Sequence, residues 1–125
     1  MDVVGIDHVQ LAMPPGREAD ARRFYGELLG FTELEKPIAL RARGGLWFQA
    51  GPVQLHLGIE PDMRASQKAH PALRVRDLDA WRARLEPAGF EWKPSDELPG
   101  TRRAHTRDPF GNRLELIEAE PARTG

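Results

Sequence analysis

One order of predicted elements occurs twice in this chain of 125 residues. Hydrophobic periodicity predicts a strand, a helix and several further strands, then a polar link over 61–69, then the same order again. Each half, about 1–60 and about 70–120, is too small to bury a good core alone, so the two are expected to share one. The repeat predicts one α+β domain spanning 1–125, with a short tail at 121–125. Its two βαβββ modules would form curved antiparallel sheets around a cup-shaped site, with the helices outside.

Two segments have the 3.6-residue period of amphipathic helices. The first, 18–29, carries one apolar stripe and is followed by Gly30, a typical residue for a helix end. The second, 78–88, follows Asp77, a favourable N-cap, and ends before Gly89. These signals predict one helix in each half.

Strands are predicted where apolar and polar residues alternate, and where Pro and Gly-rich turns punctuate the chain. In such strands successive side chains point to opposite faces. The predicted strands are 4–13, 46–50, 53–59, 70–75, 104–106 and 113–118, with weaker signals at 33–42 and 90–93.

The balance of charge and the lack of cysteine exclude several classes of function. Lys and Arg number 18 against 19 Asp and Glu, so neither nucleic acid nor an anionic membrane surface is an expected partner. With no cysteine, disulfides, Cys-bound zinc and thiol nucleophiles are excluded. The longest stretch without Asp, Glu, Lys or Arg, 44–59, has 16 residues, too few to span a membrane, and no signal-peptide pattern is visible. A cytoplasmic location is therefore expected.

Four strands each place a potential metal ligand on the face opposite their apolar residues. These ligands are His8, His56, His70 and Glu115. Gln54 shares the face of His56. Imidazole is the better ligand, so His56 is favoured for that strand, and Gln54 is also a candidate for contact with the substrate. Imidazole and carboxylate suit Zn, Ni, Fe, Mn or Co. The alternative is that these polar faces are simply solvated.

Other residues are candidates for contact with a substrate. Gln10 lies two residues after His8 on the same face, and one of Trp47 and Phe48 should line the cavity. Arg74 and Arg113 are candidate clamps for a carboxylate or phosphonate. His105 does not match the phase of the other three histidines, so it is interpreted as a surface residue or a substrate contact.

Four stretches resemble the vicinal oxygen chelate superfamily. They are Gly5-Ile6-Asp7-His8-Val9-Gln10-Leu11 with Arg23-Phe24-Tyr25-Gly26-Glu27-Leu28-Leu29-Gly30-Phe31, then Ala69-His70-Pro71-Ala72-Leu73-Arg74-Val75-Arg76-Asp77-Leu78, and finally Asp108-Pro109-Phe110-Gly111-Asn112-Arg113-Leu114-Glu115-Leu116. This superfamily contains glyoxalase I, fosfomycin-resistance transferases, extradiol dioxygenases and bleomycin-resistance proteins. The resemblance covers about 5–118.

The resemblance implies a glyoxalase-like, metal-dependent enzyme acting on a small oxygen-chelating substrate through a metal-stabilised enolate-like state. The reaction would be of the isomerase, lyase or thiol transferase type. It also implies a divalent metal held by His8, His70 and Glu115, with His56 or Gln54, and Glu115 as a candidate base. Two alternatives remain open: a protein that binds and sequesters a small ligand or antibiotic without turnover, and an extradiol-type dioxygenase. A homodimer is expected.

Overall fold

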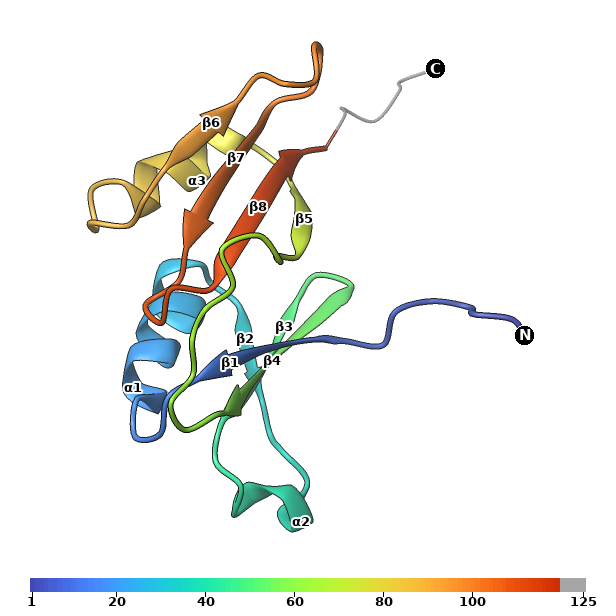
Figure 1. The fold of residues 1–125 in the computed structure, drawn as a ribbon, viewed down its shortest axis with the longest axis vertical. Helices are drawn as coiled ribbons and strands as arrows, with labels where there is room; N and C mark the ends of the chain where they lie inside the picture. The colour runs from blue at the N-terminus through green and yellow to red at the C-terminus, as the bar shows by residue number, and fades with distance from the viewer. Residues whose placement is uncertain (120–125) are drawn as a thin grey trace. The chain divides into compact units, whose positions relative to one another are not determined.

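The computed structural model describes residues 1–119. They form two compact units, one from Met1 to Ala65 and one that begins at Ser66, and each is described here by itself. Each unit contains one four-stranded sheet (Figure 1). The predicted tail at 121–125 lies outside the described residues.

The first unit has one sheet and three helical segments. Its sheet has the order β1-β4-β3-β2. The elements along the chain are β1 (Val9–Met13), α1 (Glu18–Ala21), which continues directly into the π-helical segment η1 (Arg22–Leu28), β2 (Thr32–Leu34), α2 (Ile38–Arg41), β3 (Leu46–Ala50) and β4 (Val53–Ile59).

The second unit repeats this arrangement, with the sheet order β5-β8-β7-β6. Its elements are β5 (Ala72–Val75), α3 (Leu78–Leu85), β6 (Lys93–Ser95), β7 (Arg103–Arg107) and β8 (Arg113–Glu118). The predicted α+β fold with two βαβββ modules is confirmed. The sheets are mixed, however, because β1 pairs with β4, and β5 with β8, in parallel. The other pairs in both sheets are antiparallel, as expected.

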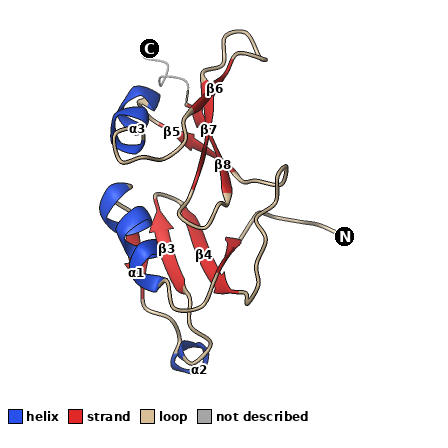
Figure 2. Ribbon diagram, turned by 60° about the vertical axis from the view of Figure 1, so that its left-hand side comes forward, coloured by secondary structure: helices blue, strands red, loops and turns tan. Residues whose placement is uncertain are grey.

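Aromatic side chains fill the core of the first unit. Phe24 and Tyr25 from η1 are buried and meet edge to face, with ring centroids 4.8 Å apart. Tyr25 also contacts Phe48 of β3, which is fully buried. Phe48 therefore faces the core, and its neighbour Trp47 faces the other side of the sheet. Figure 2 shows α1 and η1 alongside this sheet.

In the second unit, α3 covers the apolar face of the sheet. Its buried residues Leu78 and Leu85 lie with Leu114 and Leu116 of β8 in the core. As predicted, the side chain of Asp77 caps the helix, because it accepts a hydrogen bond from the backbone N–H of Ala80. The opposite face of the sheet is left to polar side chains.

Four strand predictions were wrong in their extent. The first strand was expected over 4–13, but β1 begins at Val9. Its parallel partner β4 begins at Val53, and the pairing starts at Val9 with Leu55, so β4 offers no partner for residues 4–6. The weak strand signal at 33–42 gives only β2, after which α2 begins behind Pro37. The strand expected over 70–75 begins at Ala72, so His70 precedes it, and the weak signal at 90–93 meets β6 only at Lys93.

No helix within residues 1–119 has both the length and the apolar character that crossing a membrane requires.

Candidate metal centre in the second unit

The hairpin of β7 and β8 sets the geometry of the site. Its turn is fixed by the buried carboxylate of Asp108, which accepts hydrogen bonds from the backbone N–H groups of Phe110 and Asn112 and from the Asn112 side chain. This turn fixes the register, so His105 of β7 lies directly opposite Glu115 of β8. Residues opposite one another in a sheet share a face, so both side chains point away from α3.

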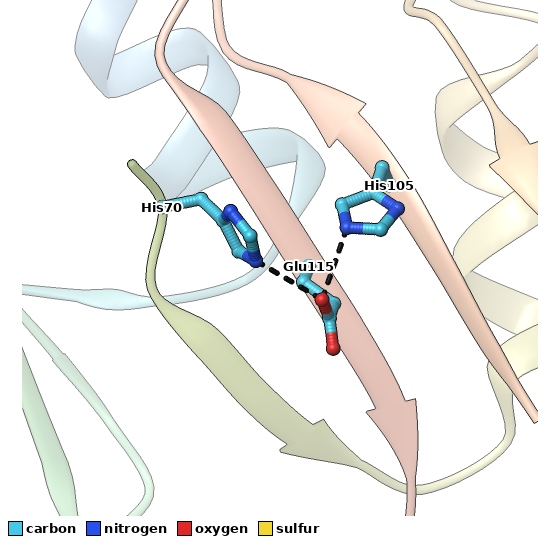
Figure 3. A group of neighbouring side chains, drawn as sticks. All are labelled: His70, His105 and Glu115. Carbon is cyan, nitrogen blue, oxygen red and sulfur yellow. Dashed lines mark hydrogen bonds and ion pairs between the residues drawn. The ribbon is translucent and has the colours of Figure 1, made fainter. Parts of the chain in front are cut away.

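Two histidines contact the same carboxylate oxygen. The Nε2 atoms of His70 and His105 each lie 3.0 Å from Oε1 of Glu115. Figure 3 shows the two imidazole rings directed at this carboxylate from either side of β8. Glu115 itself is buried, with 4% of its surface exposed. A buried carboxylate thus has imidazole nitrogens as its close partners.

The ring of His70 is fixed by a backbone carbonyl. Its Nδ1 lies 2.6 Å from the carbonyl oxygen of Lys68, which can only accept, so Nδ1 must carry the hydrogen. In neutral His70 the Nε2 atom then has a lone pair facing a carboxylate oxygen. Nε2 of His70 and Oε1 of Glu115 would then be two acceptors only 3.0 Å apart, which repel unless a positive charge lies between them. That charge is either a proton on Nε2, which makes His70 an imidazolium, or a metal ion.

Arg103 contacts the other oxygen of the carboxylate. Its Nη2 lies 3.0 Å from Oε2 of Glu115. Burial alone would raise the pKa of Glu115, but the contact with the His70 ring and the charge of Arg103 outweigh it and hold the pKa below its ordinary value. Glu115 is therefore ionised near neutral pH.

His105 is the residue whose strand face was misjudged from the sequence. It was interpreted as a surface residue or a substrate contact out of phase with the other histidines, but it shares a face and a hydrogen bond with Glu115. If residues are paired outward from the turn at 108–112, position 105 lies opposite position 115. This hairpin register could have shown from the sequence that His105 and Glu115 share a face. Burial and the charge of Arg113 lower the pKa of His105, so its imidazole is neutral at pH 7, the form that binds metals.

The three side chains fit a divalent metal. The potential ligand atoms of His70, His105 and Glu115 all lie within 4.8 Å of one another, and among residues 1–119 they make up the one such group of three or more. Two ligand atoms that are each about 2.0–2.2 Å from one ion stand roughly 3 Å apart, as each imidazole nitrogen does from Oε1. Hydrogen bonds to Lys68 and from Arg103 would orient the ligands, as outer partners do in metal sites.

The other predicted ligands lie in the first unit. His56 of β4 is buried between two rings, with the centroid of His8 4.1 Å away and that of Trp47 4.2 Å away, both nearly parallel to it. Its Nε2 is 3.0 Å from Oε1 of Gln54. Burial and the nearby His8 lower the pKa of His56. The sequence could not tell whether Trp47 or Phe48 lies on the polar face, and the structure places Trp47 there.

The predicted substrate contacts are divided between the units in the same way. Gln10 lies opposite His56 in the first sheet, and its side chain passes over Gly58, where a Cβ would meet it. Arg74 lies opposite Ile117 in the second sheet and is exposed. Arg113 donates to the carbonyl of Lys68 and so lies beside His70. The structure thus brings together His70 and Glu115 in one unit, and His8 and His56 in the other.

The family model for the Glyoxalase/Bleomycin resistance protein/Dioxygenase superfamily matches residues 5–116. The chain belongs to this superfamily. The match covers both modules of this glyoxalase-superfamily protein and confirms the resemblance seen in its sequence. No curated protein matches it significantly.

Solved structures agree with this assignment. A protein from Bacillus anthracis assigned to the glyoxalase family is 41% identical, with a TM-score of 0.90 over 96% of this chain and 98% of that one. A glyoxalase family protein from Enterococcus faecalis is 26% identical, with a TM-score of 0.72 over 92% and 98%. The fosfomycin resistance protein FosX from Listeria monocytogenes is 15% identical, with a TM-score of 0.77 over 95% and 96%, and shares the fold.

Proposed function

We propose that this superfamily member is a glyoxalase-like, metal-dependent enzyme that acts on a small molecule with two neighbouring oxygens. The observation that carries the proposal is the contact between Nε2 of His70 and Oε1 of Glu115, because a neutral His70 tautomer fixed by Lys68 leaves two acceptors that need a shared cation. His105 adds a second imidazole to the same oxygen.

His70, His105 and Glu115 would hold the divalent ion, and their ligand chemistry suits Zn, Ni, Fe, Mn and Co. When bound, such an ion acts as a Lewis acid that stabilises negative charge on substrate oxygens. The expected reaction is of the isomerase, lyase or thiol transferase type. The sequence also predicts His8, together with His56 or Gln54, as metal ligands, and this stays a prediction.

The chain's own residues favour a ligand role for Glu115. A general base works best when its pKa lies near the working pH, whereas the pKa of Glu115 is lowered. Arg103 keeps the carboxylate ionised and occupies its second oxygen. We therefore assign Glu115 first to metal binding, and its role as a base is secondary.

The donor set also favours one alternative reaction. Two histidines and one carboxylate are the ligand set of non-haem iron enzymes that activate oxygen, so an extradiol-type dioxygenase is the second candidate. Oxygen consumption with Fe²⁺ and a catechol would distinguish it from the glyoxalase-like reactions.

Metal binding and turnover test the proposal together. The full chain is titrated with Zn²⁺, Ni²⁺, Mn²⁺, Co²⁺ and anaerobic Fe²⁺, and the thermal midpoint and bound metal are measured. It is then assayed on substrates with adjacent oxygens: a hemithioacetal, 2-oxo acids, and an epoxide with water or a thiol. The expected result is one ion per site and turnover that Glu115→Gln abolishes. Failure of every metal to bind or to raise the midpoint would contradict the proposal; stoichiometric metal without any turnover would favour the sequestration alternative.

A homodimer is part of the proposal. Members of the superfamily are commonly dimers that bind small molecules. Support comes from the N-terminal segment, in which Val3, Val4 and Ile6 are almost fully exposed, as apolar residues at a subunit contact would be in one isolated copy. Light scattering should give twice the mass of one chain. A cytoplasmic location stays a prediction of the sequence.

A further inference from the structure

A small polar cavity lies beside His105 in the second unit. Its volume is about 230 Å³, and its walls are almost entirely polar. Seven residues line it: Gln67, Glu91, Lys93, His105, Thr106, Arg107 and Arg113. Sites for complete drug-sized ligands span about 300–1,000 Å³, so this cavity suits a very small molecule or one end of a larger one.

The walls of the cavity carry an excess of positive charge. Lys93, Arg107 and Arg113 face a single acidic residue, Glu91. Glu91 is already paired with Arg107, whose Nε lies 3.4 Å from its carboxylate. Arg113 is half-buried and Lys93 exposed, and neither has a carboxylate partner within residues 1–119. Two cations are thus left without a counter-charge.

Strand register places this charge next to the candidate metal ligands. Lys93 of β6 lies opposite His105 of β7, which lies opposite Glu115 of β8. Neighbouring strands are about 4.8 Å apart, so the backbones of Lys93 and Glu115 are roughly 10 Å apart across the sheet. Arg113 lies two residues before Glu115, on the same face. His105 therefore both lines the cationic cavity and contacts the carboxylate of Glu115.

We propose that this cavity is the subsite for an oxyanion of the substrate, and that the substrate is a small organic anion, a carboxylate or a phosphonate. Lys93 and Arg113 would bind the oxyanion by charge-assisted hydrogen bonds. The neighbouring oxygens of the same molecule would then lie at His70, His105 and Glu115. This inference rests on the proposed function, because it names the substrate class of that site.

Anion binding can be measured without the metal. The full chain, with 1,10-phenanthroline present so that no bound metal attracts the anion, is titrated with methylphosphonate and with acetate at constant ionic strength. Amide chemical shifts report the site. We expect saturable shifts at residues 93, 105 and 113, and none with the uncharged dimethyl ester of methylphosphonate. The double variant Lys93→Gln/Arg113→Gln should weaken binding at least tenfold. The control Arg64→Gln/Arg76→Gln removes the same charge from exposed positions outside the cavity and should bind as the parent does.

Three results would overturn the inference. They are the absence of saturable binding of either anion, equal loss of affinity in the control variant, and unchanged affinity in the cavity variant. Co²⁺ binding, measured by absorption on the same variants, separates the two proposals. Anion binding lost with Co²⁺ retained supports the subsite, and Co²⁺ bound by a parent protein that binds neither anion contradicts the subsite alone. A parent protein that binds the anions but no metal contradicts the metal centre alone.

Discussion

Arg103 Nη2 lies 3.0 Å from Oε2 of Glu115, while the two histidines contact Oε1 of the same carboxylate. Glu115 is buried and the Arg103 side chain is only 17% exposed, so solvent screens this ion pair weakly. One oxygen of Glu115 is thus held by a fixed cation, and the other is left to the imidazoles.

Replacing Arg103 should weaken metal binding without removing a ligand. In Arg103→Met, Glu115 loses the cation that keeps it ionised and oriented, and affinity for Co²⁺ should fall about 10–100-fold. Arg103→Lys, which restores the charge, should recover part of the loss. A dissociation constant that is unchanged in Arg103→Met would show that the pair has no part in the site.

The repeat of strand, helix and strands could be predicted from the sequence because apolar periodicity is a local signal. The strands β3, β4 and β8 have the predicted bounds. The start of β1 could not be predicted, because Val4 and Ile6 alternate correctly but β4 gives them no partner. Strand length here depends on a segment more than 40 residues away.

The candidate centre was predicted only in part. Alternation placed His70 and Glu115 on polar faces, and the structure brings them into contact. The position of His105 opposite Glu115 depends on the register of the hairpin, which the turn at Asp108 sets. The alternation of side chains along one strand does not determine this register. The role of Arg103 depends on a contact between neighbouring strands for which the sequence carried no signal.

His105 should matter more for metal binding than His8 does. We expect His105→Ala to weaken Co²⁺ binding by more than about 100-fold, because it removes a ligand rather than an outer partner. His8→Ala is the matched comparison, since His8 lies in the first unit, stacked on His56. Equilibrium titration followed by absorption measures both. Equal losses would support the larger ligand set, and a loss in His8→Ala alone would exclude His105.

The turn at Asp108 should affect both stability and the site. Asp108→Ala leaves the N–H groups of Phe110 and Asn112 without their buried acceptor and should cost about 3 kcal/mol in unfolding free energy. Metal affinity should also fall, because the register of His105 is loosened. Asp108→Asn keeps one acceptor and should lose less in a urea titration. A stable Asp108→Ala protein with parental metal affinity would refute this role.

Stability of the metal-free protein should fall as the pH drops below about 6.5. Burial and the charge of His8 place the pKa of His56 below its value of 6.5 in an unfolded chain. Below pH 6.5 the unfolded chain therefore binds a proton at His56 that the folded chain does not bind. The contribution of His56 to the free energy of unfolding is complete above pH 6.5, and it is lost as the pH falls from 6.5 to the pKa of His56 in the folded protein.

The variant His56→Phe keeps a ring in the stack but removes the titrating group. Its thermal midpoint, measured in chelator, should therefore change less between pH 7.5 and 5.5 than that of the parent. His8→Phe removes the charge of His8 but leaves His56 buried, which is the larger cause of its lowered pKa, so it should flatten the pH dependence less than His56→Phe does. An equally steep pH dependence in His56→Phe would assign the effect to other groups.

A crystal structure of the full chain with bound Zn²⁺, located by anomalous scattering, tests the central claim most directly. The account predicts one ion with Nε2 of His70, Nε2 of His105 and Oε1 of Glu115 each about 2.0–2.2 Å away. An ion bound elsewhere, or these three side chains still hydrogen-bonded to one another in saturating Zn²⁺, would contradict it.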